Sequence, residues 1–114
     1  MTRNILLISD DGDFKGFLNI AALTLTKLNH QITITENKND GQIDWIIIDI
    51  DTNTENSFAY IKNARRSKQS RNIKIFSVTT NLTNEIKKQL FEIGCDSIMT
   101  KKEFIAAANN ILLF

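Results

Sequence analysis

Hydrophobic and polar positions along the chain follow two patterns in turn. In Ile5–Ile8 and Trp45–Ile48 every position is apolar, which is typical of strands buried on both faces of a sheet. After each run, apolar residues recur every three or four positions, as they do on the inner face of a helix. Ile32 and Ile34 instead alternate with threonines, so this segment predicts a strand with a single apolar face.

The rest of the chain divides into similar elements, with no internal repeat or flexible linker between them. We expect strands over residues 5–8, 31–36, 45–50, 73–78 and 97–99, and helices over 14–28, 54–67, 84–93 and 104–112. A polar loop over 37–42 joins the second and third strands, and Gly94 is expected to end the third helix. Strands that alternate with helices predict right-handed crossovers and a parallel sheet, which is the doubly wound α/β class with five strands.

The composition narrows the class of protein further. A chain of 114 residues with ordinary apolar content predicts one domain over residues 1–114. Its formal net charge of +1 lacks the positive excess of nucleic-acid-binding domains, so we expect no nucleic-acid partner. A single Cys excludes an internal disulfide and favours a cytoplasmic location. The apolar runs are far shorter than the ~20 residues of a membrane span, so we expect no membrane partner.

Polar side chains follow the strands at the point where each strand ends. In an open parallel sheet the carboxyl ends of the strands form the ligand-binding edge, so these side chains are expected to converge there. The first strand is followed by two acids, the third by two more, the fourth by a hydroxyl and the fifth by an ammonium. These residues are Asp10, Asp11, Asp49, Asp51, Thr79 and Lys101.

That set of side chains suits phosphoryl chemistry. Clustered carboxylates raise one another's pKa unless a cation lies among them, and hard oxygen ligands favour Mg²⁺. A carboxylate can attack phosphorus to form an acyl phosphate, and an ammonium and a hydroxyl can stabilise the transferred oxygens. Simpler roles compete for single residues: Asp13 is interpreted as a helix cap, and the basic segment Arg65–Arg71 as a solvated face.

With these residues in this order along the chain, the sequence resembles the receiver domain of response regulators, which is the phospho-acceptor half of two-component signalling. The resemblance spans the whole sequence and implies the flavodoxin-like strand order 2-1-3-4-5. It implies phosphorylation of Asp49, which closes the motif of an apolar strand followed by an acid in Asp44-Trp45-Ile46-Ile47-Ile48-Asp49. It further implies Mg²⁺ as cofactor, held by Asp10, Asp11, Asp49 and the backbone carbonyl of Asp51, a phosphoryl group contacted by Thr79, Thr80 and Lys101, and switch positions at Thr79 and Ile98.

The resemblance also implies partners. A sensor histidine kinase or a phosphotransfer protein would supply the phosphoryl group, and an output protein of unknown identity would bind the phosphorylated form. On this interpretation the chain signals by protein docking and is not a turnover enzyme.

Two departures from the family concern the last strand and helix. Position 102 is Lys where the family has a proline that follows a cis bond, and a cis bond without proline costs ~2.5–4 kcal/mol, so we expect a trans bond. Thr100 and Glu103 have the spacing of a capping box, which would begin a helix at Lys101 and could draw its ammonium away from Asp49. The aromatic switch residue of the family is Ile98 here, so a Tyr or Phe rotamer change is not available.

Two further departures concern the segment before the third strand and the residue after Thr79. Residues 36–44 leave room only for a loop where the family has its second helix, so that helix is expected to be shortened or absent. The polar Thr33 and Thr35 agree with this loss, and apolar surface of the third strand would then be exposed or used to form a homodimer. Thr80 replaces a smaller residue and is expected to restrict access to the phosphoryl site.

Three alternatives remain open at this stage. The departures favour a pseudo-receiver that acts as an interaction scaffold without phosphorylation. Asp49-Ile50-Asp51 also resembles the opening motif of haloacid-dehalogenase-type phosphatases, but only Glu103 follows Lys101 where those enzymes need an acidic pair. Finally, the chain could be the receiver half of a longer DNA-binding regulator.

Overall fold

The computed structural model describes residues 2–37, 41–52 and 56–113. Strands and helices follow one another in the order that the hydrophobic pattern predicted, except that the last helix is divided in two. In chain order the elements are β1 (Thr2–Ile8), α1 (Gly12–Lys27), β2 (Gln31–Thr35), β3 (Trp45–Asp49), α2 (Ser57–Arg66), β4 (Lys74–Thr79), α3 (Asn84–Glu92), β5 (Ser97–Thr100), α4 (Lys101–Ala106) and α5 (Ala108–Leu113).

The strands form one five-stranded sheet in the order β2-β1-β3-β4-β5, and every pair of neighbours is parallel. This confirms the predicted doubly wound α/β fold and its strand order. The register places Ile8 opposite Ile48, Asp49 opposite Val78, and Thr79 opposite Thr100. Because the carboxyl ends of β1, β3, β4 and β5 are aligned in this way, the residues that follow them meet at one edge.

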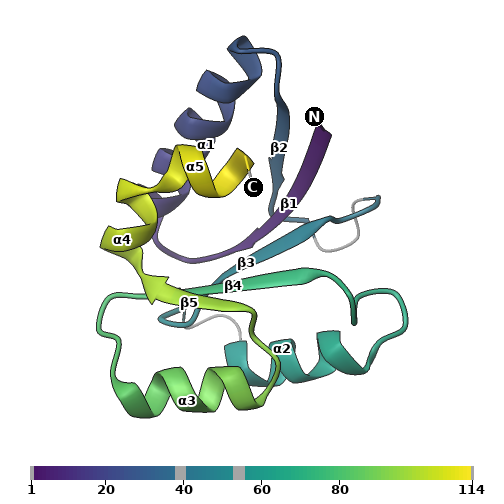
Figure 1. Cartoon of the computed structure of the whole chain (residues 1–114), viewed down its shortest axis with the longest axis vertical. Coiled ribbons are helices and arrows are strands. Elements are labelled where there is room, and N and C mark those ends of the chain that lie inside the picture. The colour runs from purple at the N-terminus through teal and green to yellow at the C-terminus, as the bar shows by residue number, and fades with distance from the viewer. Residues whose placement is uncertain (1, 38–40, 53–55, 114) are drawn as a thin grey trace.

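Helices cover both faces of the sheet, and each face has its own apolar core (Figure 1). On one face α1, α4 and α5 cover the sheet with Phe14, Phe104 and Leu112, which are all buried. On the other face α2 and α3 contribute Ile61 and Leu90, both completely buried. Such burial of a continuous apolar face on either side is what stabilises a parallel sheet.

The described residues between β2 and β3 form no helix, which agrees with the expectation that the family's second helix is shortened or absent. Residues 38–40 lie outside the described part of the chain. The expected exposure of the third strand is wrong, however, because all five residues of β3 are buried. Ile43, Phe58 and Tyr60 pack against the core on that face and cover the strand. The structure therefore gives no support to the expected homodimer through an exposed face of β3.

Several element ends differ from the sequence-based expectation. Residues 54 and 55, where a helix was expected to begin, lie outside the described part, and α2 begins at Ser57 after the cap residue Asn56. The last helix is divided at Ala107, whose N–H is shared between the carbonyls of Glu103 and Phe104, each at 3.2 Å. Gly94 ends α3 with a φ of +109°, as expected.

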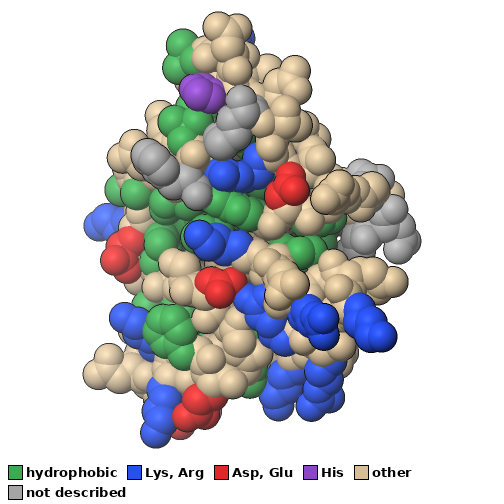
Figure 2. Space-filling model, turned by 45° about the vertical axis from the view of Figure 1, so that its right-hand side comes forward, with side chains coloured by type: hydrophobic (Ala, Val, Ile, Leu, Met, Phe, Trp, Pro, Cys, Tyr) green, Lys and Arg blue, Asp and Glu red, His purple; other side chains and the backbone are tan. Residues whose placement is uncertain are grey.

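The interpretation of the basic segment Arg65–Arg71 as a solvated face is wrong for Arg65. Figure 2 shows Lys and Arg side chains gathered over the region of α2, yet the Arg65 guanidinium is turned inward into a set of hydrogen bonds. Its Nε donates to the Gly94 carbonyl at 2.7 Å, and its Nη1 donates to the Ile73 carbonyl at 2.6 Å. Its Nη2 forms an ion pair with Asp96 at 2.5 Å. Arg65 therefore ties α2 to the start of β4 and the loop before β5.

Across residues 2–37, 41–52 and 56–113, none of the helices has the length and apolar character needed to cross a membrane.

Candidate functional site

The carboxyl edge of the sheet brings together the predicted acids, hydroxyl and ammonium. Asp49 is the last residue of β3 and is only 1% exposed, whereas Asp51 lies two residues further on at the surface. Thr79 ends β4 and is buried, and Lys101 follows β5 as the first residue of α4. Asp11 lies in the turn between β1 and α1. These five positions come from four strand ends, as the sheet topology requires.

The Lys101 ammonium is the centre of this cluster. Its Nζ lies 2.9 Å from Asp49 Oδ2, 3.1 Å from Asp11 Oδ2 and 3.3 Å from Asp51 Oδ2. The expectation that Lys101 is drawn away from Asp49 is therefore wrong. The long aliphatic stem of a lysine lets the ammonium reach an acid even when its backbone belongs to a helix.

The other local expectations for this segment are confirmed. Peptide bonds throughout the described part of the chain are trans, which includes the bond between Lys101 and Lys102. Thr100 and Glu103 form the capping box: the Glu103 N–H donates to Thr100 Oγ1 at 3.0 Å, and the Thr100 N–H donates to Glu103 Oε1 at 3.1 Å. The capping box thus begins the helix without moving the ammonium out of the site.

The electrostatics of the cluster favour the charged form of Lys101. Burial opposes the charge on Lys101, whose side chain is 14% exposed, but hydrogen bonds to Asp49 and Asp11 outweigh it and raise the pKa of the ammonium. Three carboxylates around one ammonium leave a formal charge of −2 (−3 + 1) when all four groups are ionised. The site therefore retains an excess of negative charge that a further cation can balance.

Asp49 is held in place by two hydrogen bonds besides its ion pair. The Ser9 hydroxyl donates to Asp49 Oδ2 at 2.7 Å, and the backbone N–H of Asp51 donates to Asp49 Oδ1 at 2.9 Å. Both oxygens of the carboxylate are thus oriented by fixed donors. Ser9 was missed by sequence reasoning, although its place directly after β1 and before the acid pair could have indicated it.

Asp11 has a structural role as well as a place in the site. Its Oδ1 accepts hydrogen bonds from the backbone N–H groups of Asp13 and Phe14, at 3.1 and 3.2 Å, so Asp11 caps α1. The interpretation of Asp13 as the cap is wrong, since Asp13 lies in the first turn of the helix. The hydrogen bond from Phe14, followed by that from Lys101, lowers the pKa of Asp11. Asp10 is exposed, and its side chain is not among the three acids paired with Lys101.

Asp51 contacts the two threonines that follow β4. The Thr79 hydroxyl donates to Asp51 Oδ1 at 2.6 Å, and the Thr80 N–H donates to Asp51 Oδ2 at 2.8 Å. Partial burial opposes ionisation of Asp51, but the hydrogen bonds from Thr79 and Thr80 outweigh it and lower the pKa. Sequence reasoning assigned only the backbone carbonyl of Asp51, and so missed this bridge between the end of β3 and the end of β4.

The second switch position lies away from the ion pairs. Ile98 in β5 is buried and packs with Ile75, Leu90 and Cys95 in the core beneath α2 and α3. Thr80, by contrast, is exposed at the rim of the site. Of the residues selected from the sequence, the structure therefore gathers Asp11, Asp49, Asp51, Thr79 and Lys101 into one cluster, and leaves Asp10, Thr80 and Ile98 around it.

The donor set fits Mg²⁺ in type. Among the described residues no three Asp, Glu, His or Cys side chains are arranged as a complete metal cage. Mg²⁺ does not need one, since it usually binds through one or two carboxylates and keeps several waters. Asp11 and Asp49 each place a carboxylate oxygen within 3.1 Å of the same cationic nitrogen, so they can share a cation.

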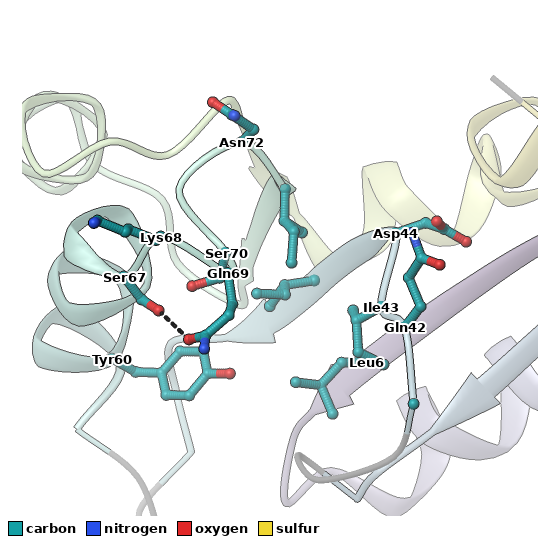
Figure 3. Close-up of a pocket in the computed structure, with 13 residues that line it drawn as sticks. Leu6, Gln42, Ile43, Asp44, Tyr60, Ser67, Lys68, Gln69, Ser70 and Asn72 are labelled. Atoms are coloured by element: carbon teal, nitrogen blue, oxygen red, sulfur yellow. Dashed lines mark hydrogen bonds between the residues drawn. The ribbon is translucent and has the colours of Figure 1, made fainter.

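A separate cavity lies at the opposite, amino-terminal edge of β3 and β4 (Figure 3). It has a volume of about 710 Å³, with Leu6, Ile46 and Ile73 among its apolar lining residues. Tyr60, Lys68 and Gln69 contribute its polar side, where Ser67 donates a 3.0 Å hydrogen bond to Gln69 Oε1. None of the acids paired with Lys101 lines this cavity, so the carboxylate cluster is not part of it.

No family model and no curated protein matches this chain. Solved structures of response regulators nevertheless share its fold over nearly its whole length. A response regulator from Hahella chejuensis has a TM-score of 0.80 at 19% identity, over 98% of this chain and 93% of that one. The phosphorylated cyanobacterial phytochrome response regulator RcpA has a TM-score of 0.80 at 11% identity, over 97% of this chain and 91% of that one.

A third example is the receiver domain of the sensor histidine kinase PA1611 from Pseudomonas aeruginosa, whose active-site cleft holds a magnesium ion. Its TM-score is 0.74 at 17% identity, and the match covers 98% of this chain and 95% of that one. At these identities the likeness concerns the fold, which is that of response-regulator receiver domains.

Proposed function

We propose that this chain is a phospho-acceptor receiver of a two-component or phosphorelay pathway, and that Asp49 is the residue phosphorylated. The observation that carries the proposal is the ion pair of 2.9 Å between Lys101 Nζ and Asp49 Oδ2, with Asp11 bound to the same ammonium. A nucleophilic carboxylate, a second acid for a metal and a fixed cation are what transfer of a phosphoryl group to aspartate needs.

The proposed reaction is a displacement at phosphorus. An Asp49 oxygen forms a bond to phosphorus while the phosphorus–nitrogen bond of a phosphohistidine breaks, and its electron pair leaves with the imidazole nitrogen. Ser9 and the Asp51 N–H orient the Asp49 carboxylate for this attack, and Lys101 neutralises charge on the transferred oxygens. Mg²⁺, when bound by Asp11 and Asp49, would supply further positive charge to those oxygens.

Thr79 and Thr80 are placed to bind the phosphoryl group once it is attached. The Thr79 hydroxyl and the Thr80 N–H are both donors, and both point at the carboxylate of Asp51. If the phosphoryl oxygens replace that carboxylate, the ends of β3 and β4 must rearrange locally. Such a change is the signal that an output protein would recognise.

This proposal is supported by the receiver fold, which the chain shares with a phosphorylated response regulator and with a magnesium-bound receiver domain of a sensor histidine kinase. We infer that the donor is a sensor histidine kinase or a phosphotransfer protein, that output is through protein docking, and that the chain acts in the cytoplasm. We also propose that it is not a turnover enzyme. A phosphatase would need Asp51 as a protonated general acid, but hydrogen bonds from the threonines lower the pKa of that carboxyl despite its partial burial.

The test is incubation with acetyl phosphate and Mg²⁺, followed by measurement of intact mass. We expect a gain of one phosphoryl group in the wild type and none in Asp49→Asn. Asp13→Asn is the matched control, because Asp13 lies next to the site in α1 and makes no contact with Lys101. No gain in the wild type, or an equal gain in Asp49→Asn, would contradict the proposal, and turnover of p-nitrophenyl phosphate would revive the phosphatase interpretation.

One observation favours a second candidate, the interaction scaffold that is never phosphorylated. The two donors best placed for a phosphoryl group are already occupied by Asp51. On that hypothesis Mg²⁺ and acetyl phosphate leave the thermal stability unchanged, and Asp49→Asn behaves as the wild type in binding its partner. A rise in melting temperature with Mg²⁺ that is lost in Asp49→Asn favours the phospho-acceptor receiver over the scaffold.

A further inference from the structure

The solvent-facing side of α1 carries a row of large apolar side chains. Ile20 is 66% exposed and Leu23 64%, and Phe17 is 37% exposed beside them. Single exposed apolar residues are ordinary on protein surfaces, but a contiguous apolar patch marks an interaction site. These three residues lie within two turns of the same helix, so they form one patch.

The opposite side of α1 is already used in the core. Phe14, Leu18 and Leu25 are at most 3% exposed and pack on the sheet. The middle of α1 therefore carries apolar side chains on its outer side as well as on its core side, although Asn19 and Thr24 are polar. Within the described part of the chain, α4 and α5 pack beside α1 and leave its outer side open (Figure 1). Something outside this chain is needed to cover it.

The polar residues at the ends of the patch show what fits there. Asp13 and Lys27 each stand seven positions from Ile20 (20 − 13 and 27 − 20), one towards each end of α1. Seven residues are about two helical turns, or ~10.5 Å, so both lie on the same side of the helix as Ile20. Both are exposed, and neither forms an ion pair within the described residues.

A second copy of α1 in antiparallel orientation complements this arrangement. If a two-fold axis passes beside Ile20, a residue n positions before it faces the residue n positions after it in the other copy. Asp13 then faces Lys27 of the second copy, and Lys27 faces Asp13 of the second copy. The dimer therefore has two Asp–Lys ion pairs. Phe17 faces Leu23 in the same way, so apolar side chains meet around the axis.

Gly16 allows the two helices to approach closely. It lies one turn before Ile20, and a Cβ atom added to it would meet nothing within 4 Å. Under the same symmetry Gly16 faces Thr24, which is small and exposed. The centre of the patch thus combines small and large side chains that can interlock across a helix pair.

We propose that this protein forms a homodimer through the outer side of α1, with the two helices antiparallel about an axis at Ile20. The surface is independent of Asp49, so the proposal does not rest on phosphorylation. A single pair of helices ~24 Å long makes a small interface, and small interfaces are weak. The dimer is therefore expected to be in equilibrium with the monomer at micromolar concentrations.

The experiment is sedimentation velocity of the full chain over a range of concentrations. We expect the weight-average mass to rise from monomer to dimer in the wild type. Ile20→Ser should remain monomeric at the concentration at which the wild type is half dimeric. Ile20 is exposed, so its substitution leaves the core intact, and thermal unfolding of the variant verifies this.

Charge reversal tests the antiparallel register itself. Asp13→Lys alone and Lys27→Asp alone should each weaken dimerisation by about tenfold, because two symmetry-related pairs become repulsive. The double reversal, Asp13→Lys with Lys27→Asp, should restore dimerisation to within about twofold of the wild type. Glu92→Lys in α3 is the control for charge alone and should change nothing.

Two results would overturn the proposal. A wild type that stays monomeric at all accessible concentrations shows that a second copy does not cover the patch. A dimer that the Ile20 and charge variants do not affect shows that the interface is elsewhere.

Discussion

The hydroxyl of Thr79 donates a hydrogen bond of 2.6 Å to Oδ1 of Asp51, and the next backbone N–H, that of Thr80, donates to the other oxygen of the same carboxylate at 2.8 Å. The carboxylate thus occupies two donors at the end of β4 that a phosphoryl group on Asp49 would use. If Asp49 is phosphorylated as proposed, the phosphoryl group has to displace the Asp51 carboxylate from these donors; we call this contact the Asp51 latch.

Asp51→Asn should therefore speed phosphorylation of Asp49. The amide keeps the backbone but loses the negative charge, and a neutral acceptor is weaker by about 1 kcal/mol, which corresponds to about fivefold in rate. The measurement is the initial rate of mass gain with acetyl phosphate at saturating Mg²⁺. A rate equal to or below that of the wild type would show that the latch does not limit the reaction.

Lys101→Met should destabilise the folded protein. Removal of the ammonium leaves the buried Asp49 without its counter-charge beside two further acids, and breaking such a pair costs about 3 kcal/mol. Urea denaturation measures the loss. Lys102→Met is the matched control, because its side chain is exposed, and should stay within about 0.5 kcal/mol of the wild type. Equal stability of the two variants would show that the ion pairs contribute little.

Mg²⁺ should raise the melting temperature, because the site has more negative charge than Lys101 balances and a cation that binds only the folded state stabilises it. The rise should be smaller in Asp11→Asn, which loses a carboxylate, and larger in Lys101→Met, where no ammonium competes with the metal. Thermal unfolding in a MgCl₂ titration, reversed with a chelator, gives the comparison. The same rise in all three proteins would place the metal elsewhere.

The stability should fall in acid through two carboxyls of the site whose pKa is lowered, those of Asp11 and Asp51. In the folded state hydrogen bonds from Phe14 and Lys101 lower the pKa of Asp11, and hydrogen bonds from the threonines lower that of Asp51. The folded protein therefore binds fewer protons than the unfolded chain near and below the ordinary value of 3.8. Stability is full above that pH and is lost as the pH falls through the lowered folded values.

Urea denaturation from about pH 5.5 down to about pH 2, across and below the ordinary Asp pKa of 3.8, measures this dependence. The double variant Asp11→Asn with Asp51→Asn should have a flatter profile than the wild type. An identical slope in the two proteins would assign the acid sensitivity to other groups.

Arg65→Met should cost about 2–3 kcal/mol, because it removes the guanidinium donor to the carbonyls of Ile73 and Gly94 and the ion-pair partner of Asp96. Arg66→Met, at the next position of α2, is the control and should be nearly neutral. Equilibrium unfolding of the two variants distinguishes a structural arginine from a solvated one. A neutral Arg65→Met would show that water replaces the guanidinium without loss.

The sequence by itself determined the architecture. Apolar runs and helical spacing are local patterns, and they predicted the parallel sheet and the strand ends at which Asp49, Thr79 and Lys101 lie, whereas the strand order was implied by the family resemblance. Topology then required these residues to meet, because the carboxyl ends of parallel strands share an edge. The trans bond at Lys101 and the capping box at Thr100 were also predictable, since both depend on adjacent residues.

Only the tertiary structure decided how these side chains pair. Lys101 meets Asp11 across 90 positions of the chain, and Thr79 meets Asp51 across 28. Such contacts depend on the rotamers of long side chains and on which donors remain unpaired after packing, and no local pattern encodes either. For the same reason the sequence placed Arg65 on a basic surface, whereas in the structure its guanidinium donates hydrogen bonds to the carbonyls of Gly94 and Ile73. The hydrogen bond from Thr79 to Asp51 likewise depends on how the ends of β3 and β4 are brought together.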